Sequence, residues 1–290
     1  MRRIWLLAIC AILFGPVSAR AQNSCAEGKE PRLPSRAADA MPGSAFAAHV
    51  AAMTESERDA AIGAELSAGN IPSFVRNLVP VTLDAAVPGG RIVHVTACVL
   101  ADYLAIGSDR DAIFTPMRLR TALAVAGQYG FTLPTSRLVD AIYAQAAIHL
   151  APQPLPAGDE MRSTGYYLHH NALIEAQRAA LGVVPGLLTA GHMKDLVLTG
   201  RLWRFLDRVA IYGWHRGEND PIQPLSTVHG ANYADYSHGV RLVSSTILVD
   251  GVPMSIFDAL EDPILARALN GEGPIANLRQ LLGILVQPRL

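Results

Sequence analysis

The spacing of apolar residues is helical over several long segments before residue 160. The first segment covers residues 46–70, where Thr54 stands three positions ahead of Glu57, the capping-box spacing found at helix starts. Gly69 then provides a stop signal shortly before a proline. The pattern therefore predicts helical structure in this segment, with a helix start at Thr54.

Two more helices are expected in this half of the chain. The first has Thr115 as its N-cap and Pro116 at the first helical position, where proline loses no hydrogen bond. The second is capped by Thr132 or Thr135. A proline-rich stretch at 152–156 follows and predicts a linker.

Strand-like runs dominate after residue 190, where short β-branched and aromatic segments alternate with turn residues. Residues 217–220 and the pair Asp250 and Gly251 have the composition of hairpin turns. In the first half of the chain, residues 91–107 predict one or two further strands.

These elements predict an α+β fold, in which a helical N-terminal half packs on a mixed or antiparallel sheet formed mainly by the C-terminal half. Residues 22–45 are expected to form an extended leader, because they are rich in Pro, Ala, Ser and charge. Residues 46–290 are expected to form a single α+β domain, and 153–160 is the place where it would divide.

The start of the chain has the pattern of a secretory signal peptide. A basic beginning precedes an apolar run at 4–14, which is too short to span a bilayer as a helix. Ala19 and Ala21 satisfy the small-x-small cleavage rule, so residues 1–21 are expected to be removed. The mature protein is then periplasmic or secreted, with no membrane span left after cleavage.

Signal cleavage changes the charge balance. The full chain has 24 basic and 25 acidic residues, and removal of Arg2, Arg3 and Arg20 leaves 21 basic residues and a net charge of −4. A chain with this balance lacks the basic footprint that nucleic-acid binding requires. The expected partner is an extracellular or envelope polymer or a small molecule, and not nucleic acid.

Two cysteines remain after cleavage, Cys25 and Cys98. An oxidising compartment permits a disulfide between them, which would attach the leader to the domain. Two alternatives stay open: Cys98 is a small buried hydrophobic residue, or it is a catalytic thiol.

Histidine and tyrosine concentrate between 166 and 238, where six of the nine histidines and five of the eight tyrosines lie. Imidazole is the commonest metal ligand and the commonest general acid or base near neutral pH. The concentration favours a functional site in this region. Any single histidine of the set is more often a packed core residue than a site residue.

Lys194 is the only lysine outside the leader, since Lys29 is the other one in the chain. It lies between His192 and Asp195, where Gly191 predicts a turn that leads into a strand. Because the chain otherwise uses arginine, the position suggests a need for an ammonium group. Chance codon use is the alternative.

Several signatures of known chemistry are missing from the sequence. It contains no G-x-S-x-G elbow, no Walker-type phosphate loop and no HExxH zinc motif. The spacing of His192 and Asp195 also departs by one residue from the pattern of lysostaphin-like zinc peptidases, whose H-x-H element is missing too. None of these families therefore provides a function.

Three blocks, GHMKD, VAIYGWH and DYSHGVRLV, are similar to blocks in a group of uncharacterised secreted bacterial proteins. The resemblance covers most of the mature chain. It implies no activity, cofactor or mechanism.

The leading hypothesis is a secreted or periplasmic hydrolase that acts on a cell-envelope or extracellular polymer. Four residues are the predicted catalytic group: His192, Lys194, Asp195 and His238. Asp195 would orient an imidazole or bind a metal, Lys194 would stabilise developing negative charge, and His238 would be a general base or ligand.

The substrate is expected to contact Tyr233, Tyr236 and His215. A divalent metal such as zinc, if the site holds one, would be bound by His192, His229 and His238.

A non-catalytic module that binds carbohydrate or peptidoglycan, or an envelope scaffold, is the alternative, because tyrosine at strand edges also suits sugar stacking. His229 and His238 are nine residues apart, so a regular strand or helix would place them on opposite sides. They share a site only if 230–237 is an irregular loop. Asp235 is then the natural partner of His238.

Overall fold

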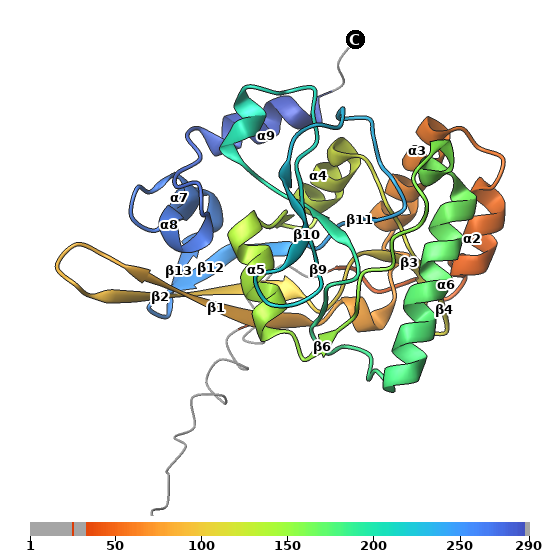
Figure 1. Cartoon of the computed structure of the whole chain (residues 1–290), viewed down its shortest axis with the longest axis horizontal. Coiled ribbons are helices and arrows are strands. Elements are labelled where there is room, and N and C mark those ends of the chain that lie inside the picture. The colour runs from red at the N-terminus through yellow and green to blue at the C-terminus, as the bar shows by residue number, and fades with distance from the viewer. Residues whose placement is uncertain (1–24, 26–32, 288–290) are drawn as a thin grey trace, which may run out of the picture.

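The computed structural model describes Cys25 and residues 33–287 (Figure 1). The predicted signal peptide at 1–21 lies outside the described residues, as do 22–24 and 26–32 of the predicted leader. The described chain mixes helices with several sheets, in which most strand pairs are antiparallel.

The largest sheet joins strands from both halves of the chain. Its order is β1-β2-β12-β13, β5 also pairs with β12, and all of these pairs are antiparallel. The strands are β1 (Leu78–Ala86), β2 (Ile92–Leu100), β5 (Phe131–Thr132), β12 (Val243–Val249) and β13 (Val252–Ser255). The predicted hairpin at Asp250 and Gly251 is confirmed, and both residues have the positive φ angles, 48° and 81°, that such a tight turn requires.

The predicted division into a helical N-terminal half and a C-terminal sheet is wrong. The long strands β1 and β2 lie before residue 101, and helices are scattered through the described chain. The sequence pattern did not predict β1, because Pro80 interrupts it and proline cannot donate a hydrogen bond within a sheet. β1 lies at the edge of the sheet, where this loss is tolerated.

A second sheet carries most of the predicted site. Its order is β10-β9-β8-β11, and β8 pairs antiparallel with β9 and parallel with β11. The strands are β8 (Lys194–Leu196), β9 (Ile211–His215), β10 (Pro221–Ser226) and β11 (His238–Gly239). The predicted turn at 217–220 is confirmed, because β9 and β10 form an antiparallel hairpin around it.

Two short strand pairs complete the described sheets. They are β3 (Ala105–Ser108) with β4 (Asp111–Phe114), antiparallel, and β6 (Ile148–His149) with β7 (Thr189–Ala190), parallel. The 91–107 segment thus contains β2 and the start of β3, as predicted.

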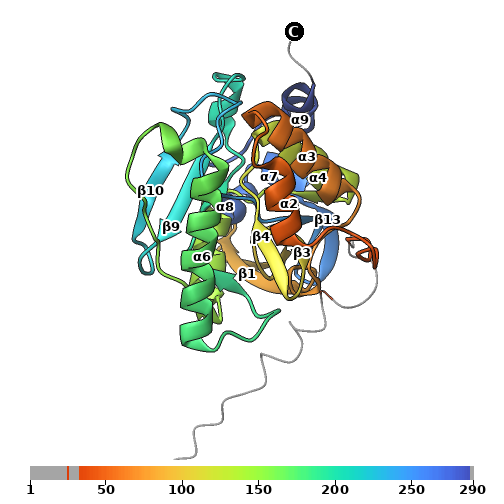
Figure 2. The same cartoon turned by 90° about the vertical axis from the view of Figure 1, so that its right-hand side faces the viewer.

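Helices α2, α3 and α6 lie on one side, α7, α8 and α9 lie on another, and α4 and α5 lie between them (Figure 1). Figure 2 shows α6 between the β9–β10 hairpin and helices α2 and α3. An aromatic cluster of Tyr167, Trp214 and Tyr236 attaches α6 to β9 and to the loop that precedes β11. The helices are α2 (Gly43–Val50), α3 (Glu55–Ser67), α4 (Leu119–Gln128), α5 (Ser136–Gln145), α6 (Thr164–Leu181), α7 (Ile256–Glu261), α8 (Ala266–Leu269) and α9 (Leu278–Val286).

Two of the predicted helix starts are confirmed. Thr54 forms a full capping box with Glu57, and Thr135 accepts a hydrogen bond from the Leu138 amide at the start of α5. The predicted start at Thr115 is wrong, because α4 begins three residues after Pro116, at Leu119.

A residue of another helix explains the later start of α4. The carboxylate of Asp59 on α3 accepts hydrogen bonds from the Arg118 backbone amide (2.8 Å) and the Thr121 hydroxyl (2.6 Å). Asp59 of α3 therefore supplies the hydrogen-bond acceptor that the first turn of α4 needs. For this reason α4 begins at Leu119 and not at the cap that the local sequence predicted.

Cys25 and Cys98 form a disulfide with a sequence separation of 73 residues. Cys98 lies in β2, so the bond attaches Cys25 to an inner strand of the largest sheet, between β1 and β12. The pairing replaces both alternatives, a free buried cysteine and a catalytic thiol.

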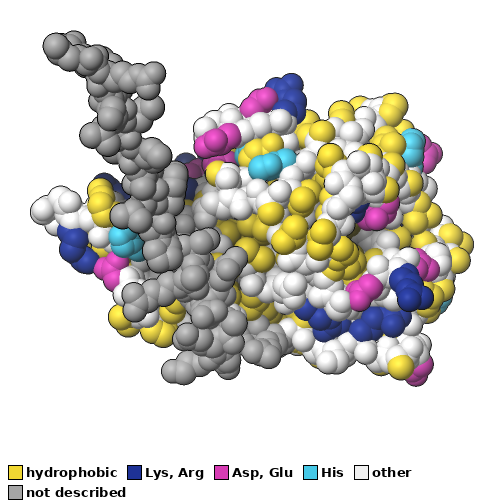
Figure 3. Space-filling view, turned by 90° about the horizontal axis from the view of Figure 1, so that it is seen from below, with side chains coloured by type: hydrophobic (Ala, Val, Ile, Leu, Met, Phe, Trp, Pro, Cys, Tyr) yellow, Lys and Arg dark blue, Asp and Glu magenta, His cyan; other side chains and the backbone are white. Residues whose placement is uncertain are grey.

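Acidic and basic side chains lie close together among apolar ones on the face that Figure 3 shows. Among the described residues, no helix is both long enough and apolar enough to cross a membrane.

Candidate functional site

Strand β8 divides the predicted site residues between two sides of the second sheet. Gly191, His192 and Met193 form a bend, as the sequence predicted, and β8 follows at Lys194. In the parallel pair with β11, Lys194 lies opposite His238 and Asp195 lies opposite Gly239. Because neighbouring strand residues point to opposite faces, Lys194 and Asp195 belong to different groups of side chains.

The first group, which we call the Lys194 cluster, comprises Lys194, Asp235, His238, His229 and Tyr233. The Oδ2 atom of Asp235 lies 3.9 Å from Nζ of Lys194 and 3.7 Å from Nε2 of His238. The Tyr233 hydroxyl donates a hydrogen bond to the same oxygen, at 3.3 Å. One carboxylate therefore lies between an ammonium group and an imidazole.

The position of Asp235 is fixed from its other oxygen. Oδ1 accepts hydrogen bonds from the Ser237 backbone amide (2.8 Å) and the Ser237 hydroxyl (2.6 Å). These bonds close a tight turn ahead of β11, and residues 231–237 contain no helix or strand. The predicted condition for bringing His229 and His238 together, an irregular loop between them, is confirmed, and their ring centroids are 6.3 Å apart.

His229 and Tyr233 form the outer layer of the Lys194 cluster. Their rings stack at 4.1 Å with an interplanar angle of 7°, and both side chains are half-buried. His238 below them is fully buried, and the ring of Trp214 lies 4.9 Å from Nζ of Lys194. The stacked pair thus separates a buried charged group from solvent.

The surroundings shift the protonation of all these groups. Burial lowers the pKa of His238 to about 4, and it lowers the pKa of Lys194, although Asp235 opposes the second shift. Burial also lowers the pKa of His229. For Asp235, burial acts to raise the pKa, but His238, Lys194 and Ser237 outweigh it, so the pKa lies below its ordinary value. At neutral pH the cluster therefore holds a neutral imidazole beside a carboxylate.

Two side chains of the cluster keep unused hydrogen-bonding groups. Among the described residues, neither ring nitrogen of His238 has a hydrogen-bond partner. The carboxylate nearest to the Lys194 ammonium, at 3.9 Å, is beyond hydrogen-bonding distance. Buried polar groups are normally paired. The ring nitrogens of the buried His192 are unpaired in the same way among the described residues.

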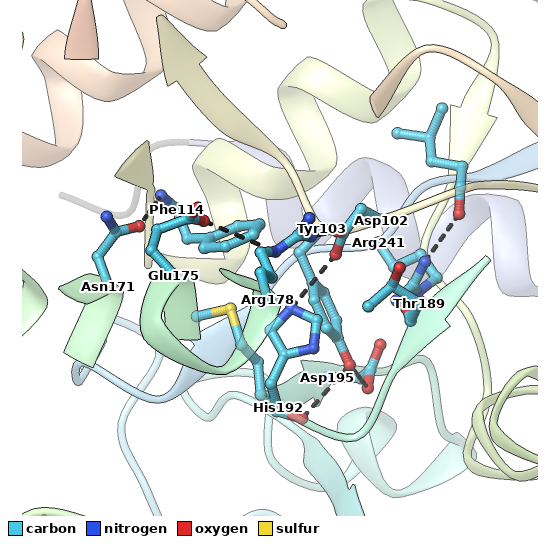
Figure 4. Close-up of polar contacts among 12 residues, drawn as sticks. Asp102, Tyr103, Phe114, Asn171, Glu175, Arg178, Thr189, His192, Asp195 and Arg241 are labelled. Atoms are coloured by element: carbon cyan, nitrogen blue, oxygen red, sulfur yellow. Dashed lines mark hydrogen bonds and ion pairs between the residues drawn. The ribbon is translucent and has the colours of Figure 1, made fainter. Parts of the chain in front are cut away.

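The second group surrounds Asp195 and is closed to solvent (Figure 4). The Tyr103 hydroxyl donates to Oδ2 of Asp195 at 2.7 Å, and the Arg241 guanidinium lies 4.3 Å from the centre of the Tyr103 ring. Arg241 also donates to the backbone oxygens of Leu100 (2.8 Å) and Thr189 (2.5 Å). Burial raises the pKa of Asp195 to about 6, against the opposing effects of Arg241 and Tyr103.

His192 belongs to a third arrangement, in which Arg178 pairs with Asp102 and Asp102 lies 3.3 Å from Nε2 of His192 (Figure 4). Burial, Arg178 and Arg241 hold the pKa of His192 well below its ordinary value. Its ring packs against Tyr103 and Phe114. His192 is therefore a neutral, fully buried part of the core.

The remaining predicted site residues lie elsewhere. The Tyr236 ring packs against His170 and Trp214, and its hydroxyl accepts a hydrogen bond from the Leu155 amide at 2.7 Å. His215 ends β9 as predicted, but it stacks on Tyr143 and lies 3.0 Å from Asp140. Tyr236 thus belongs to the aromatic cluster with Tyr167 and Trp214, and His215 lies with Asp140 and Tyr143.

The predicted metal ligands do not converge, because His192 lies in the Arg178 and Asp102 arrangement while His229 and His238 lie in the Lys194 cluster. In the part of the chain that the structure describes, no group of three or more His, Cys, Asp or Glu side chains is arranged to hold a metal ion. The predicted set of His192, His229 and His238 therefore does not form a zinc site.

The sequence analysis missed three charged residues near the site, the buried Asp102 and Arg241 and the partly buried Arg178. A signal existed for two of them. Asp102 and Arg241 each interrupt an otherwise apolar run, and a charge inside such a run must be paired when the run is buried.

Glycine is expected to be required at position 239, because Tyr103 and Met193 pack closely against its Cα atom. A Cβ atom at this position would lie 2.7 Å from Cδ1 of Tyr103 and 2.8 Å from Cβ of Met193. We expect Gly239→Ala to lower the free energy of unfolding by about 1–3 kcal/mol in urea titrations, as overpacked cores do. Gly230→Ala is the matched control, because its Cβ would meet nothing closer than 3.9 Å, and equal losses in both variants would contradict this packing.

Comparison with known proteins adds no assignment to this geometry. No family model, no curated protein and no solved structure matches the chain.

Proposed function

We propose that the protein is a hydrolase whose active site is the Lys194 cluster. The observation that carries the proposal is the buried neutral imidazole of His238 and the ammonium of Lys194 on either side of Asp235. Hydrolysis needs a base that accepts a proton and a positive group that stabilises the negative charge on oxygen. The Lys194 cluster supplies both groups, one on either side of Asp235.

Each side chain has a role in this proposal. His238 accepts a proton from the attacking water, and Asp235 stabilises the imidazolium that forms. Lys194 donates hydrogen bonds to the oxygen on which negative charge develops. Tyr233 and His229 cover His238, so substrate binding has to displace this stacked pair.

The substrate is proposed to be an extracellular or cell-envelope polymer. The signal-peptide pattern supports export, and the disulfide between Cys25 and Cys98 supports an oxidising compartment such as the periplasm. The two surface hollows of about 420 and 390 Å³ are lined by other residues, so we propose that the substrate binds over the half-buried His229 and Tyr233 pair.

The test is a turnover screen of the mature protein on peptidoglycan, on polysaccharides and on chromogenic esters and amides. For any substrate that is hydrolysed, we expect His238→Gln and Lys194→Met each to lower kcat about 100-fold or more. His169→Gln is the control, because His169 is the exposed neighbour of the buried His170 on α6. Folded His238→Gln and Lys194→Met variants with undiminished turnover would contradict the proposal.

A non-catalytic module that binds carbohydrate or peptidoglycan is the second candidate. The observation that favours it is the half-exposed stacked pair of Tyr233 and His229, since an aromatic face binds a sugar ring without catalysis. Under this function, Tyr233→Ala would abolish sedimentation with peptidoglycan while Lys194→Met would leave it unchanged. Loss of turnover in Lys194→Met would instead favour the hydrolase.

A further inference from the structure

The amine of Lys194 has the surroundings of a nucleophile. Its side chain is 10% exposed, and its Nζ atom lies 3.9 Å from the nearest carboxylate oxygen, that of Asp235. The Trp214 ring covers the amine at 4.9 Å. Burial, which lowers the pKa of Lys194, increases the fraction of free amine that can attack an electrophile.

Groups that move protons stand next to this amine. Register in the β8–β11 pair places His238 directly opposite Lys194, and both nitrogens of its imidazole are free among the described residues. Asp235 lies between them, and Tyr233 donates to its carboxylate. An amine that attacks a carbonyl carbon needs a donor and an acceptor of protons in the same place.

We propose that Lys194 forms a Schiff base with a small aldehyde or ketone. The unprotonated amine attacks the carbonyl carbon, and the carbonyl oxygen takes a proton to give a carbinolamine. The carbinolamine then loses its hydroxyl group as water and the remaining proton on nitrogen, which gives the imine. The net reaction converts amine and carbonyl into imine and water and needs no oxidant or reductant. His238 supplies and receives these protons.

This inference goes beyond hydrolysis and does not depend on it. Hydrolysis uses Lys194 as a positive group, whereas imine formation uses its free amine. The two are separated experimentally because the imine is detected as a covalent adduct, without turnover of any polymer.

The experiment treats the mature protein with glyoxylate or glycolaldehyde in the presence of cyanoborohydride and maps the adduct by peptide mass. The chain contains two lysines, Lys29 and Lys194, so the modified peptide identifies the amine directly. We expect one adduct, on Lys194, that forms about 10-fold faster at pH 7 in the folded protein than in guanidinium chloride. Lys194→Arg should abolish it, and Lys29→Arg should leave it unchanged.

His238→Gln tests the proton transfer. It should slow adduct formation on Lys194 about 10-fold, while His169→Gln should not change the rate. The proposal is overturned if neither carbonyl compound modifies Lys194 in the folded protein, or if the folded and denatured chains react at the same rate. An unchanged rate in folded His238→Gln would overturn the role given to His238.

Discussion

Acidification from pH 7 to about 4 is expected to destabilise the fold by at least about 3 kcal/mol, mainly through three buried histidines, His170, His192 and His238. Burial lowers the pKa of His170 and of His238 to about 4, and holds that of His192 well below its ordinary value. For His170 and His238 alone, each shift corresponds to about 3 kcal/mol.

The direction of the effect follows from proton binding. In the unfolded chain these histidines take up protons near pH 6.5, whereas in the folded chain His170 and His238 stay neutral down to about pH 4. Between these values the unfolded chain binds more protons, so acid favours unfolding. The stability that the neutral histidines contribute is therefore present above pH 6.5 and is lost as the pH falls through about 4.

Asp195 acts in the opposite direction. Burial raises its pKa to about 6, so its contribution to stability is present below the ordinary aspartate value and is lost as the pH rises through about 6. Near pH 5 the three histidines outweigh this one carboxyl. We expect the free energy of unfolding to fall by about 3 kcal/mol per pH unit there, which corresponds to a net uptake of two protons.

Urea titrations at several pH values between 7 and 4 measure this slope. His170→Gln is expected to reduce it by about 1.4 kcal/mol per pH unit, the effect of one proton. His169→Gln is the matched control, since His169 is the exposed neighbour on the same helix. Asp195→Asn should make the slope steeper. Equal slopes for His169→Gln and His170→Gln would show that burial of His170 does not control its protonation.

The sequence predicted helix caps and turns correctly where residues close together in the chain make the necessary hydrogen bonds. The capping box at Thr54 and the turn at Asp250 and Gly251 need only neighbouring residues, and both are confirmed. The start of α4 was mispredicted because Asp59, far away in sequence, supplies the hydrogen bonds. The pairing of β2 with β12 could not be read from either strand alone, since about 150 residues separate them and the apolar pattern does not name a partner.

The candidate site was predicted in part for a similar reason. Concentration of histidine and tyrosine located the loop that holds Asp235 and His238, and the lone lysine located β8. The grouping of Lys194 with Asp195 failed because strand alternation sends neighbouring side chains to opposite faces. Asp102 and Arg178, whose ion pair places His192 in the core, come together only through tertiary packing.

The disulfide between Cys25 and Cys98 is expected to contribute about 4 kcal/mol to the free energy of unfolding. It closes a loop of 73 residues, and cross-linking a loop of this length restricts the unfolded chain to that extent. Cys25 and Cys98 are both buried, which limits access of a reductant to the bond in the folded protein. A reductant should therefore release free thiols much more slowly from the folded protein than from the denatured protein.

Two measurements separate the cross-link from the side chains that form it. Reduction of the mature protein removes the cross-link alone, and a Cys25→Ala, Cys98→Ala double variant also removes both sulfur atoms. We expect guanidinium chloride titrations to show a loss of about 4 kcal/mol on reduction and a slightly larger loss in the double variant, which adds a small cavity beside β2. Two titratable thiols in the unreduced protein, or a loss below about 1 kcal/mol on reduction, would mean that the bond does not restrain the unfolded chain.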